Sequence, residues 1–310
     1  MELALSLAVQ IGGMLIMAAV GFVLVKAGVC RSEDSKLLSQ VVLYASTPCA
    51  VINSFMIDLT PQRLSGFGLS ILGAAAAHAV FYLASVFSTK CLKFNEAESM
   101  SCMYANAGNL ILPLVLLTLG QDMVFYCSGF LMVQTVLIWT HCRMVISGEK
   151  KADIRKILLN VNILSIGVGL ILFLTGLRPP APLQSALDGM GRTIAPLSML
   201  IIGMLMAGMD LKKVFRIRRV YLVAFFRLIV LPLLVTVLFK VTGMAGLVQG
   251  GKEILMITML AASAPSASTV TMFSQIYGRQ QYEASAINIV TVLLCILTMP
   301  FINLVYTAFM

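Results

Sequence analysis

The sequence predicts an all-α integral membrane protein with ten transmembrane helices in a 5+5 inverted repeat. Hydrophobic residues make up 59% of the 310 positions and charged residues 11%, whereas a soluble domain carries about 25% charged residues. The mean hydropathy is +0.96. A soluble fold would leave much of this apolar surface in water, so lipid is the expected solvent. A short basic segment near the middle of the chain separates two halves that each hold five apolar runs.

Ten apolar runs are long enough to cross a bilayer, which takes about 20 residues in a helix. They are 3–25, 36–57, 66–90, 97–119, 122–146, 156–177, 190–209, 220–240, 254–277 and 284–308.

Several of these runs begin or end at recognisable signals. No basic residue precedes the first run, so we expect a retained span and not a cleaved signal peptide. Ser32, Glu33 and Asp34 suit a helix start before the second run, because a hydroxyl can cap the helix and carboxylates favour its N-terminus. The segment 120–122 forms a turn between the fourth and fifth runs, and 178–180 (Arg-Pro-Pro) stops the sixth.

The basic residues are distributed unevenly between the connecting segments. Of the 22 Lys and Arg residues, 16 follow odd-numbered runs and five follow even-numbered runs. The positive-inside rule places the basic loops in the cytoplasm and both termini outside, for a multi-pass protein of the cytoplasmic (inner) membrane. Topology therefore explains most of the +9 net charge, and no nucleic-acid partner is expected. The segment 216–220 (RIRRV) is interpreted as an anchor that also contacts anionic membrane lipid.

The two halves are predicted to be inverted repeats. The linker 147–155 separates a first five-helix repeat, 1–146, from a second, 156–310. Because five is odd, the halves must enter the membrane in opposite orientations, as in inverted-repeat transporters. Proline spacing supports this interpretation: Pro48 and Pro196 are 148 residues apart, and Pro113 and Pro265 are 152 apart.

The fourth and ninth runs each carry a polar, proline-containing stretch, NAGNLILP (106–113) and SAPSASTVT (263–271). Interrupted helices expose backbone groups that only a lined cavity tolerates, and their N-terminal ends attract anions. Small polar residues also join transmembrane helices, so packing is the alternative interpretation. The candidate substrate-binding residues are Asn106, Gly108, Asn109, Pro113, Pro265, Ser266, Ser268 and Thr269.

Few ionisable groups fall within the apolar runs. Candidates for coupling or gating are Asp58, His78, His141 and Arg227. Arg227 either snorkels towards the cytoplasmic face or has a functional role, and each histidine either carries protons or makes a hydrogen-bonded helix contact. Asn53, Gln134 and Asn288 are weaker cavity candidates. The seven scattered cysteines form no metal-ligand spacing, so neither a metal nor another cofactor is expected.

These motifs resemble the auxin efflux carrier family, whose bacterial members are often called malate permeases. The resemblance covers essentially the whole chain. It rests on STP (46–48), NAGNLILP, PLSMLIIG (196–203), RLIVLP (227–232), SAPSAS with FSQIY (263–277), and TVLLCILTMP (291–300).

The resemblance implies a mechanism and a site. Spans 1, 2, 6 and 7 would form a scaffold, and spans 3–5 and 8–10 a moving core. Spans 4 and 9 would cross as broken helices beside a small organic anion. Asn106, Asn109 and Pro113 match the crossing in span 4, and Pro265, Ser266 and Ser268 match that in span 9. A homodimer through the scaffold is also implied.

The expected function is therefore secondary transport of a carboxylate by an elevator-like mechanism. The apolar stretch 110–112 departs from the family pattern, which puts malate itself in question as the substrate. A sodium-coupled symporter of the bile-acid type, which shares the fold, and a membrane receptor that does not transport are the alternatives. An enzyme is not expected, because no clustered acids, nucleophile motif or metal spacing occurs in the sequence.

Overall fold

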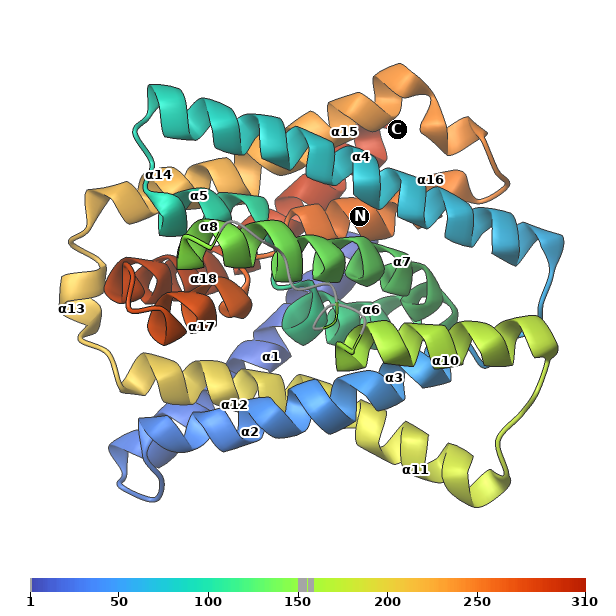
Figure 1. Cartoon of the computed structure of the whole chain (residues 1–310), viewed down its shortest axis with the longest axis horizontal. Coiled ribbons are helices and arrows are strands. Elements are labelled where there is room, and N and C mark those ends of the chain that lie inside the picture. Colours follow the sequence, from blue (N-terminus) through green and yellow to red (C-terminus); the bar gives the residue numbers. More distant parts are fainter. Residues whose placement is uncertain (1, 150–154, 156–158) are drawn as a thin grey trace.

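The computed structural model describes residues 2–149, 155 and 159–310. Most of the predicted linker 147–155 and the start of the predicted sixth span lie outside the described residues. The described chain is a bundle of helices that fall into two packed groups (Figure 1). Helices from both halves of the sequence contribute to each group.

The first half begins with one long helix and continues through several bent ones. Its elements are α1 (Glu2–Lys26), the 3₁₀ turn η1 (Ser32–Asp34), α2 (Ser35–Val41), the π-helical turn η2 (Val42–Ser46), α3 (Thr47–Ser54), α4 (Pro61–Cys91), α5 (Glu96–Met103), the π-helical turn η3 (Ala107–Ile111), α6 (Leu112–Leu119), α7 (Gln121–Leu137), the π-helical turn η4 (Ile138–Cys142) and α8 (Arg143–Ser147).

The second half is built similarly. Its elements are α10 (Val161–Thr175), α11 (Ala181–Arg192), α12 (Ile194–Ala207), α13 (Leu211–Val214), α14 (Arg218–Phe225), the π-helical turn η5 (Phe226–Val230), α15 (Leu231–Thr242), the 3₁₀ turn η6 (Met244–Gly246), α16 (Gly251–Ala262), α17 (Ser268–Ile276) and α18 (Gln281–Phe309).

One group consists of α1–α3 and α10–α12, at the bottom of Figure 1. In it α1 packs along α12, and α3 packs against α10 and α11. Glycines permit the close approach of α1 and α12: a Cβ at Gly203 would collide with the carbonyl of Ala18, and one at Gly21 with the carbonyl of Leu200. The other group holds α4–α8 and α14–α18, with α4 packed on α5, α7 and α16.

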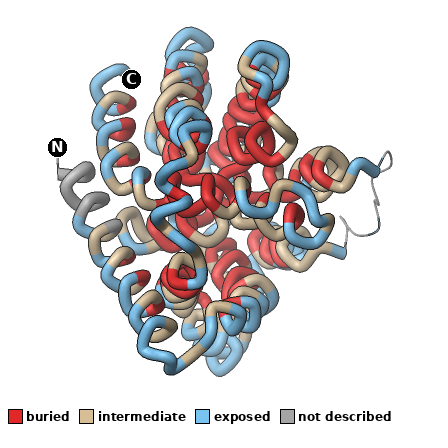
Figure 2. Tube along the Cα trace, turned by 90° about the vertical axis from the view of Figure 1, so that its left-hand side faces the viewer, coloured by how far each residue is buried: buried red, intermediate tan, exposed pale blue. Residues whose placement is uncertain are grey.

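The outer surface is apolar, as expected for a membrane protein. Residues that face the interior are buried, while exposed residues form the outer sides (Figure 2). Exposed residues include Ile16 (70% exposed), Leu83 (67%) and Leu297 (75%), which would be unfavourable in water. Among the described residues, six helices are long and apolar enough to cross a membrane, and three shorter apolar helices accompany them. The all-α membrane fold is thereby confirmed, while the count of ten spans stays a prediction.

Wide helical turns accommodate three of the prolines. The π-helical turns η2, η3 and η5 each end two residues before a proline, at Pro48, Pro113 and Pro232. Proline lacks an N–H and clashes with the preceding turn, and a wider turn relieves both problems without ending the helix. Proline alone therefore does not interrupt these spans.

Candidate functional site

Two helices of the second group are interrupted near their middle. In the fourth predicted span α5 ends at Met103, and residues 104–106 are not helical before η3 begins at Ala107. In the ninth, α16 ends at Ala262 and α17 begins at Ser268. Each interruption exposes backbone groups that lipid would not satisfy.

The two interruptions cross and form hydrogen bonds with each other. Ala105 and Ser266 face each other in an antiparallel bridge. The N–H of Asn106 donates to the carbonyl of Pro265 at 2.8 Å, and the N–H of Ala267 donates to the carbonyl of Tyr104 at 2.9 Å. Each half of the chain thus supplies one hydrogen-bond donor and one acceptor to the backbone of the other half. The two bonds are related by a two-fold axis through the bridge.

Side chains from neighbouring helices satisfy the two residues at the centre of the bridge. The Gln134 amide on α7 accepts from the N–H of Ala105 and donates to its carbonyl, both at 3.0 Å. On α18, Asn288 donates to the carbonyl of Ser266 at 2.8 Å, and the Thr291 hydroxyl accepts from the N–H of Ser266 at 3.1 Å. Gln134 and Asn288, expected as cavity residues, therefore support the backbone of the crossing.

Arg227 lies behind the crossing, fully buried, against the C-terminal ends of both interrupted helices. It donates from Nε to the carbonyl of Ala264 at 2.9 Å, from Nη1 to that of Cys102 at 3.1 Å and from Nη2 to that of Ala261 at 3.3 Å. The ring of Phe81 lies 5.3 Å from its guanidinium carbon. Helix C-termini carry unpaired carbonyls and partial negative charge, which a guanidinium fork complements. The snorkelling interpretation is thus wrong, because the side chain points into the protein.

The N-terminal ends of η3 and α17 carry no side-chain cap from the described residues. Asn106 is buried and donates from Nδ2 to Oγ of Ser268 at 3.3 Å, which joins the two ends. The buried Oγ of Ser266 has no hydrogen-bond partner in the described part of the chain. The uncapped first-turn N–H groups and the Ser266 hydroxyl therefore retain free hydrogen-bonding capacity.

Accessibility changes just beyond each interruption. Residues 101–107 and 261–267 are all buried, whereas the next two residues in each segment are half-buried. These half-buried residues are Gly108, Asn109, Ser268 and Thr269, and all four are predicted site residues. The two prolines are not equivalent in position: Pro265 lies within its interruption, while Pro113 is buried in the first turn of α6.

Three of the four predicted coupling residues lie near the crossing. The rings of His78 and His141 have centroids 6.5 Å and 6.2 Å from that of Tyr104, and His78 and Arg227 both pack on Phe81. Nδ1 of His78 on α4 lies 2.8 Å from the carbonyl of Ala74, one turn earlier, while its buried Nε2 has no partner among the described residues. Nδ1 of His141 lies 2.9 Å from the hydroxyl of Tyr104, the first residue of the α5 interruption. Tyr104 and Thr291 were not singled out from the sequence, because single hydroxyls are common in apolar helices.

Asp58 is in the segment between α3 and α4, at the right of Figure 1, away from the segments that precede α5 and α14 at the left. Its carboxylate forms an exposed ion pair with Arg178 at 2.9 Å. It also lines a pocket of about 500 Å³ together with Arg63, Tyr126 and Glu253. The structure therefore does not bring Asp58 to the crossing.

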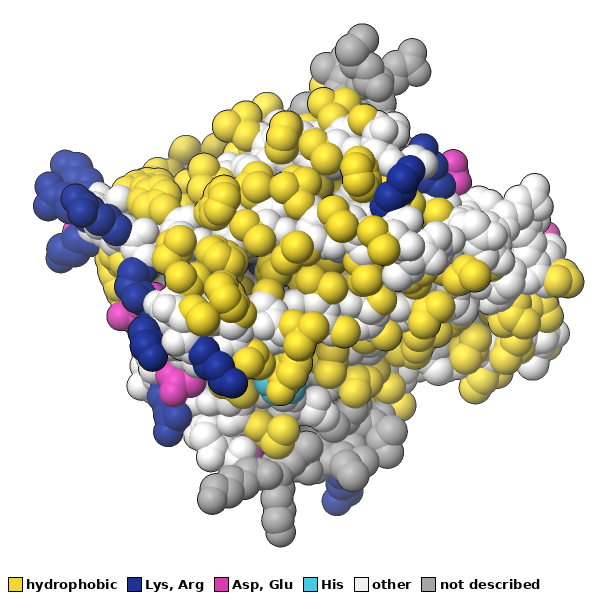
Figure 3. Space-filling model, turned by 90° about the horizontal axis from the view of Figure 1, so that it is seen from above, with side chains coloured by type: hydrophobic (Ala, Val, Ile, Leu, Met, Phe, Trp, Pro, Cys, Tyr) yellow, Lys and Arg dark blue, Asp and Glu magenta, His cyan; other side chains and the backbone are white. Residues whose placement is uncertain are grey.

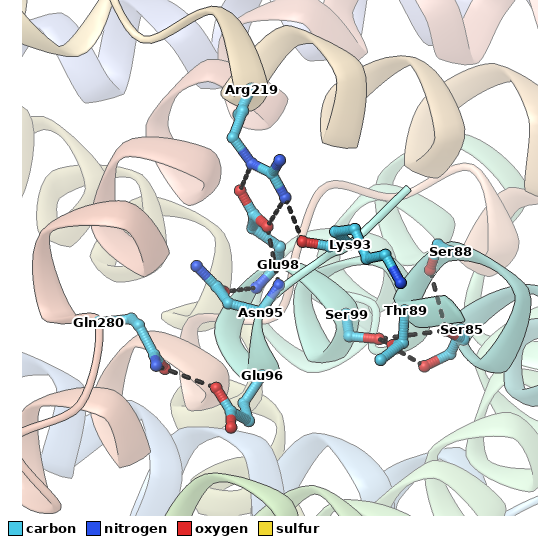
Figure 4. A network of polar contacts seen from close by, with 10 residues as sticks. All are labelled: Ser85, Ser88, Thr89, Lys93, Asn95, Glu96, Glu98, Ser99, Arg219 and Gln280. Carbon is cyan, nitrogen blue, oxygen red and sulfur yellow. Dashed lines mark hydrogen bonds and ion pairs between the residues drawn. The ribbon is translucent and has the colours of Figure 1, made fainter. Parts of the chain in front are cut away.

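A polar network holds the start of α5 in place (Figure 4). The buried carboxylate of Glu98 receives two hydrogen bonds of 2.6 Å from Arg219, at the start of α14. Asn95 and Glu98 also form a capping box on α5. A further bond joins Glu96 to Gln280, in the turn before α18, at 3.0 Å. These contacts tie α5, α14 and α18 together at the end of α5 that lies away from its interruption.

Comparison with known proteins identifies one family. A family model described as membrane transport protein matches residues 143–303. This region includes Arg227, the interruption of the ninth span and its supports on α18. A search of curated proteins found no match.

Proposed function

Because the chain belongs to the auxin efflux carrier family of membrane transport proteins, we propose that it is a secondary transporter for a small organic anion. The family also makes it a membrane transporter and not an enzyme. The observation that carries the proposal is the pair of uncapped helix N-termini beside the crossing.

An anion at this position would meet complementary groups from both halves of the chain. The first-turn N–H groups of η3 and α17 carry partial positive charge and lack side-chain acceptors among the described residues. Asn109 and Thr269 are half-buried, so they can contact a substrate directly. Arg227 is fully engaged with backbone carbonyls, so the helix ends would provide the attraction without a direct charge contact.

The proposed architecture has ten spans in two inverted five-helix repeats. The reciprocal bonds between Asn106 and Pro265 and between Ala267 and Tyr104 support it, because a two-fold axis through the bridge exchanges one bond for the other. In this proposal α1–α3 and α10–α12 form the scaffold. The remaining helices carry the crossing across the membrane as an elevator.

Uptake of labelled carboxylates into proteoliposomes tests the proposal. We expect saturable uptake of at least one member of a panel of mono- and dicarboxylates. Asn109→Ala should lower uptake about tenfold, because a hydrogen bond to a charged group contributes about 1.5 kcal/mol or more. Asn53→Ala is the matched control and should retain uptake, since Asn53 bonds Asp188 near the end of α3.

Each other result has a defined meaning. No uptake across the panel would contradict the transport proposal, and unchanged uptake in Asn109→Ala would contradict the site. Saturable binding without flux would favour the receptor alternative. Uptake that requires an imposed sodium gradient would favour the sodium-coupled alternative.

A further inference from the structure

An apolar groove lies on the outer face of the second group, between α4 and α15. It has a volume of about 370 Å³. Every lining side chain is apolar: Val80, Leu83, Ala84 and Phe87 from α4, Phe226 and Val230 from η5, and Leu234 from α15. Three of them, Leu83, Phe87 and Leu234, are 45–67% exposed, so the groove opens onto the surface that faces lipid.

Basic residues are found on the segments that adjoin one end of this groove, starting with Lys90, three residues after Phe87 on α4. Arg219 donates from Nη2 to the carbonyl of Lys93 at 2.7 Å, so the end of α4 lies beside the start of α14. Lys90, Lys93 and Arg218 are exposed at this end. Figure 3 looks onto the face that carries α4, α14 and α15, where apolar side chains cover the middle and Lys and Arg gather at the left.

The groove and the basic end are connected by aromatic rings. Phe226 lines the groove and packs edge-on against Phe94, with centroids 6.2 Å apart. The guanidinium of Arg219 lies 5.6 Å from the Phe94 ring. The charge of Arg219 is already balanced by Glu98. The remaining positive charge at the basic end is on Lys90, Lys93 and Arg218.

We propose that this groove is a binding site for one anionic phospholipid. An acyl chain lies along the apolar lining, and the phosphate lies against Lys90, Lys93 and Arg218. The chemistry favours a lipid over a second protein copy, because an apolar channel that ends in a basic cluster matches an amphiphile with a negative headgroup. Each basic side chain at a membrane surface favours an anionic headgroup by about fivefold.

Tryptophan quenching by brominated lipids tests the proposal on the intact protein. The chain has one tryptophan, Trp139, which is first replaced by phenylalanine. Phe87→Trp then places a probe in the groove, and Ile171→Trp places a matched probe on exposed α10. Each variant is reconstituted in phosphatidylcholine that contains a small fraction of phosphatidylglycerol, with bromine on the acyl chains of one or the other lipid.

We expect brominated phosphatidylglycerol to quench the groove probe at a mole fraction at least fivefold lower than brominated phosphatidylcholine. The α10 probe should show no preference. The triple variant Lys90→Gln, Lys93→Gln and Arg218→Gln should remove the preference in the groove while leaving the protein monodisperse.

Two results would overturn the proposal. Equal quenching of the groove probe by both lipids would mean that ordinary annular lipid fills the groove. No quenching by either lipid would mean that protein covers it. Neither result depends on transport, so the proposal can fail while the transport proposal stands.

Discussion

At the scale of single residues, the buried polar side chains around the crossing hold the backbone. Gln134 pairs with both backbone groups of Ala105, and Arg227 satisfies three carbonyls at two helix ends. A buried donor or acceptor without a partner costs about 1–3 kcal/mol, so each of these side chains contributes substantially to one local conformation. In the proposed site, the half-buried residues just beyond them would contact the substrate.

Replacement of Arg227 tests this role. Arg227→Met should lower the free energy of unfolding by about 3 kcal/mol, because three buried carbonyls lose a charged donor. Arg227→Lys should fall between the parent and Arg227→Met, since an ammonium cannot reproduce the planar fork. Thermal unfolding in detergent measures both.

Arg216→Met serves as the control, because Arg216 is exposed and surface substitutions usually change stability by less than about 0.5 kcal/mol. If Arg227→Met has the same midpoint of thermal unfolding as the parent protein, the guanidinium does not stabilise the two helix ends.

At the scale of helices, the sequence located both unusual segments and the interruption of the ninth span, but not the exact position of the interruption in the fourth. The polar stretches NAGNLILP and SAPSASTVT do adjoin the crossing. Pro113, however, lies in α6 behind a wide turn, and the first interruption is at 104–106. Proline restricts the backbone, but a π-helical turn absorbs that restriction, so the residue alone does not predict a break.

Substitution of Pro113 tests whether this proline has a direct role at the site or is only accommodated in the helix. Pro113→Ala should keep uptake within about twofold of the parent, because none of the hydrogen bonds described at the crossing involves Pro113. Ala105→Pro should instead prevent recovery of monodisperse protein, because proline has no N–H to donate to the Gln134 side-chain oxygen. Uptake in proteoliposomes and size-exclusion chromatography measure the two effects. A folded Pro113→Ala protein without uptake would assign the proline a direct role at the site.

At the scale of the whole molecule, hydropathy predicted the membrane fold because apolar surface depends on composition. The roles of Arg227 and Gln134 were not predictable in this way. Arg227 bonds Cys102, 125 positions away, and Gln134 bonds Ala105, 29 positions away. Such contacts depend on which helices pack together, and a single sequence does not state that directly.

The predicted topology can be tested with reporters. A reporter fused after Met310 should be extracytoplasmic, because α18 follows Arg279 by two residues and its 29 residues are long and apolar enough to cross the membrane. A reporter fused after Gly148 should be cytoplasmic. Alkaline phosphatase activity and green fluorescence give complementary signals. Fluorescence from a fusion after Met310 would place the C-terminus in the cytoplasm. The predicted orientation or the predicted number of spans would then be wrong.

The reciprocal bonding at the crossing has a consequence for biogenesis. When the first half leaves the ribosome, the N–H of Asn106 and the carbonyl of Tyr104 still lack the partners that come from residues 265 and 267. The carbonyl of Cys102 likewise lacks its donor until Arg227 has been synthesised. The first half therefore cannot mature by itself inside the insertion machinery, and quality-control proteases have a window in which to recognise it. Two halves made as separate polypeptides should rescue one another, whereas either half made alone should be degraded.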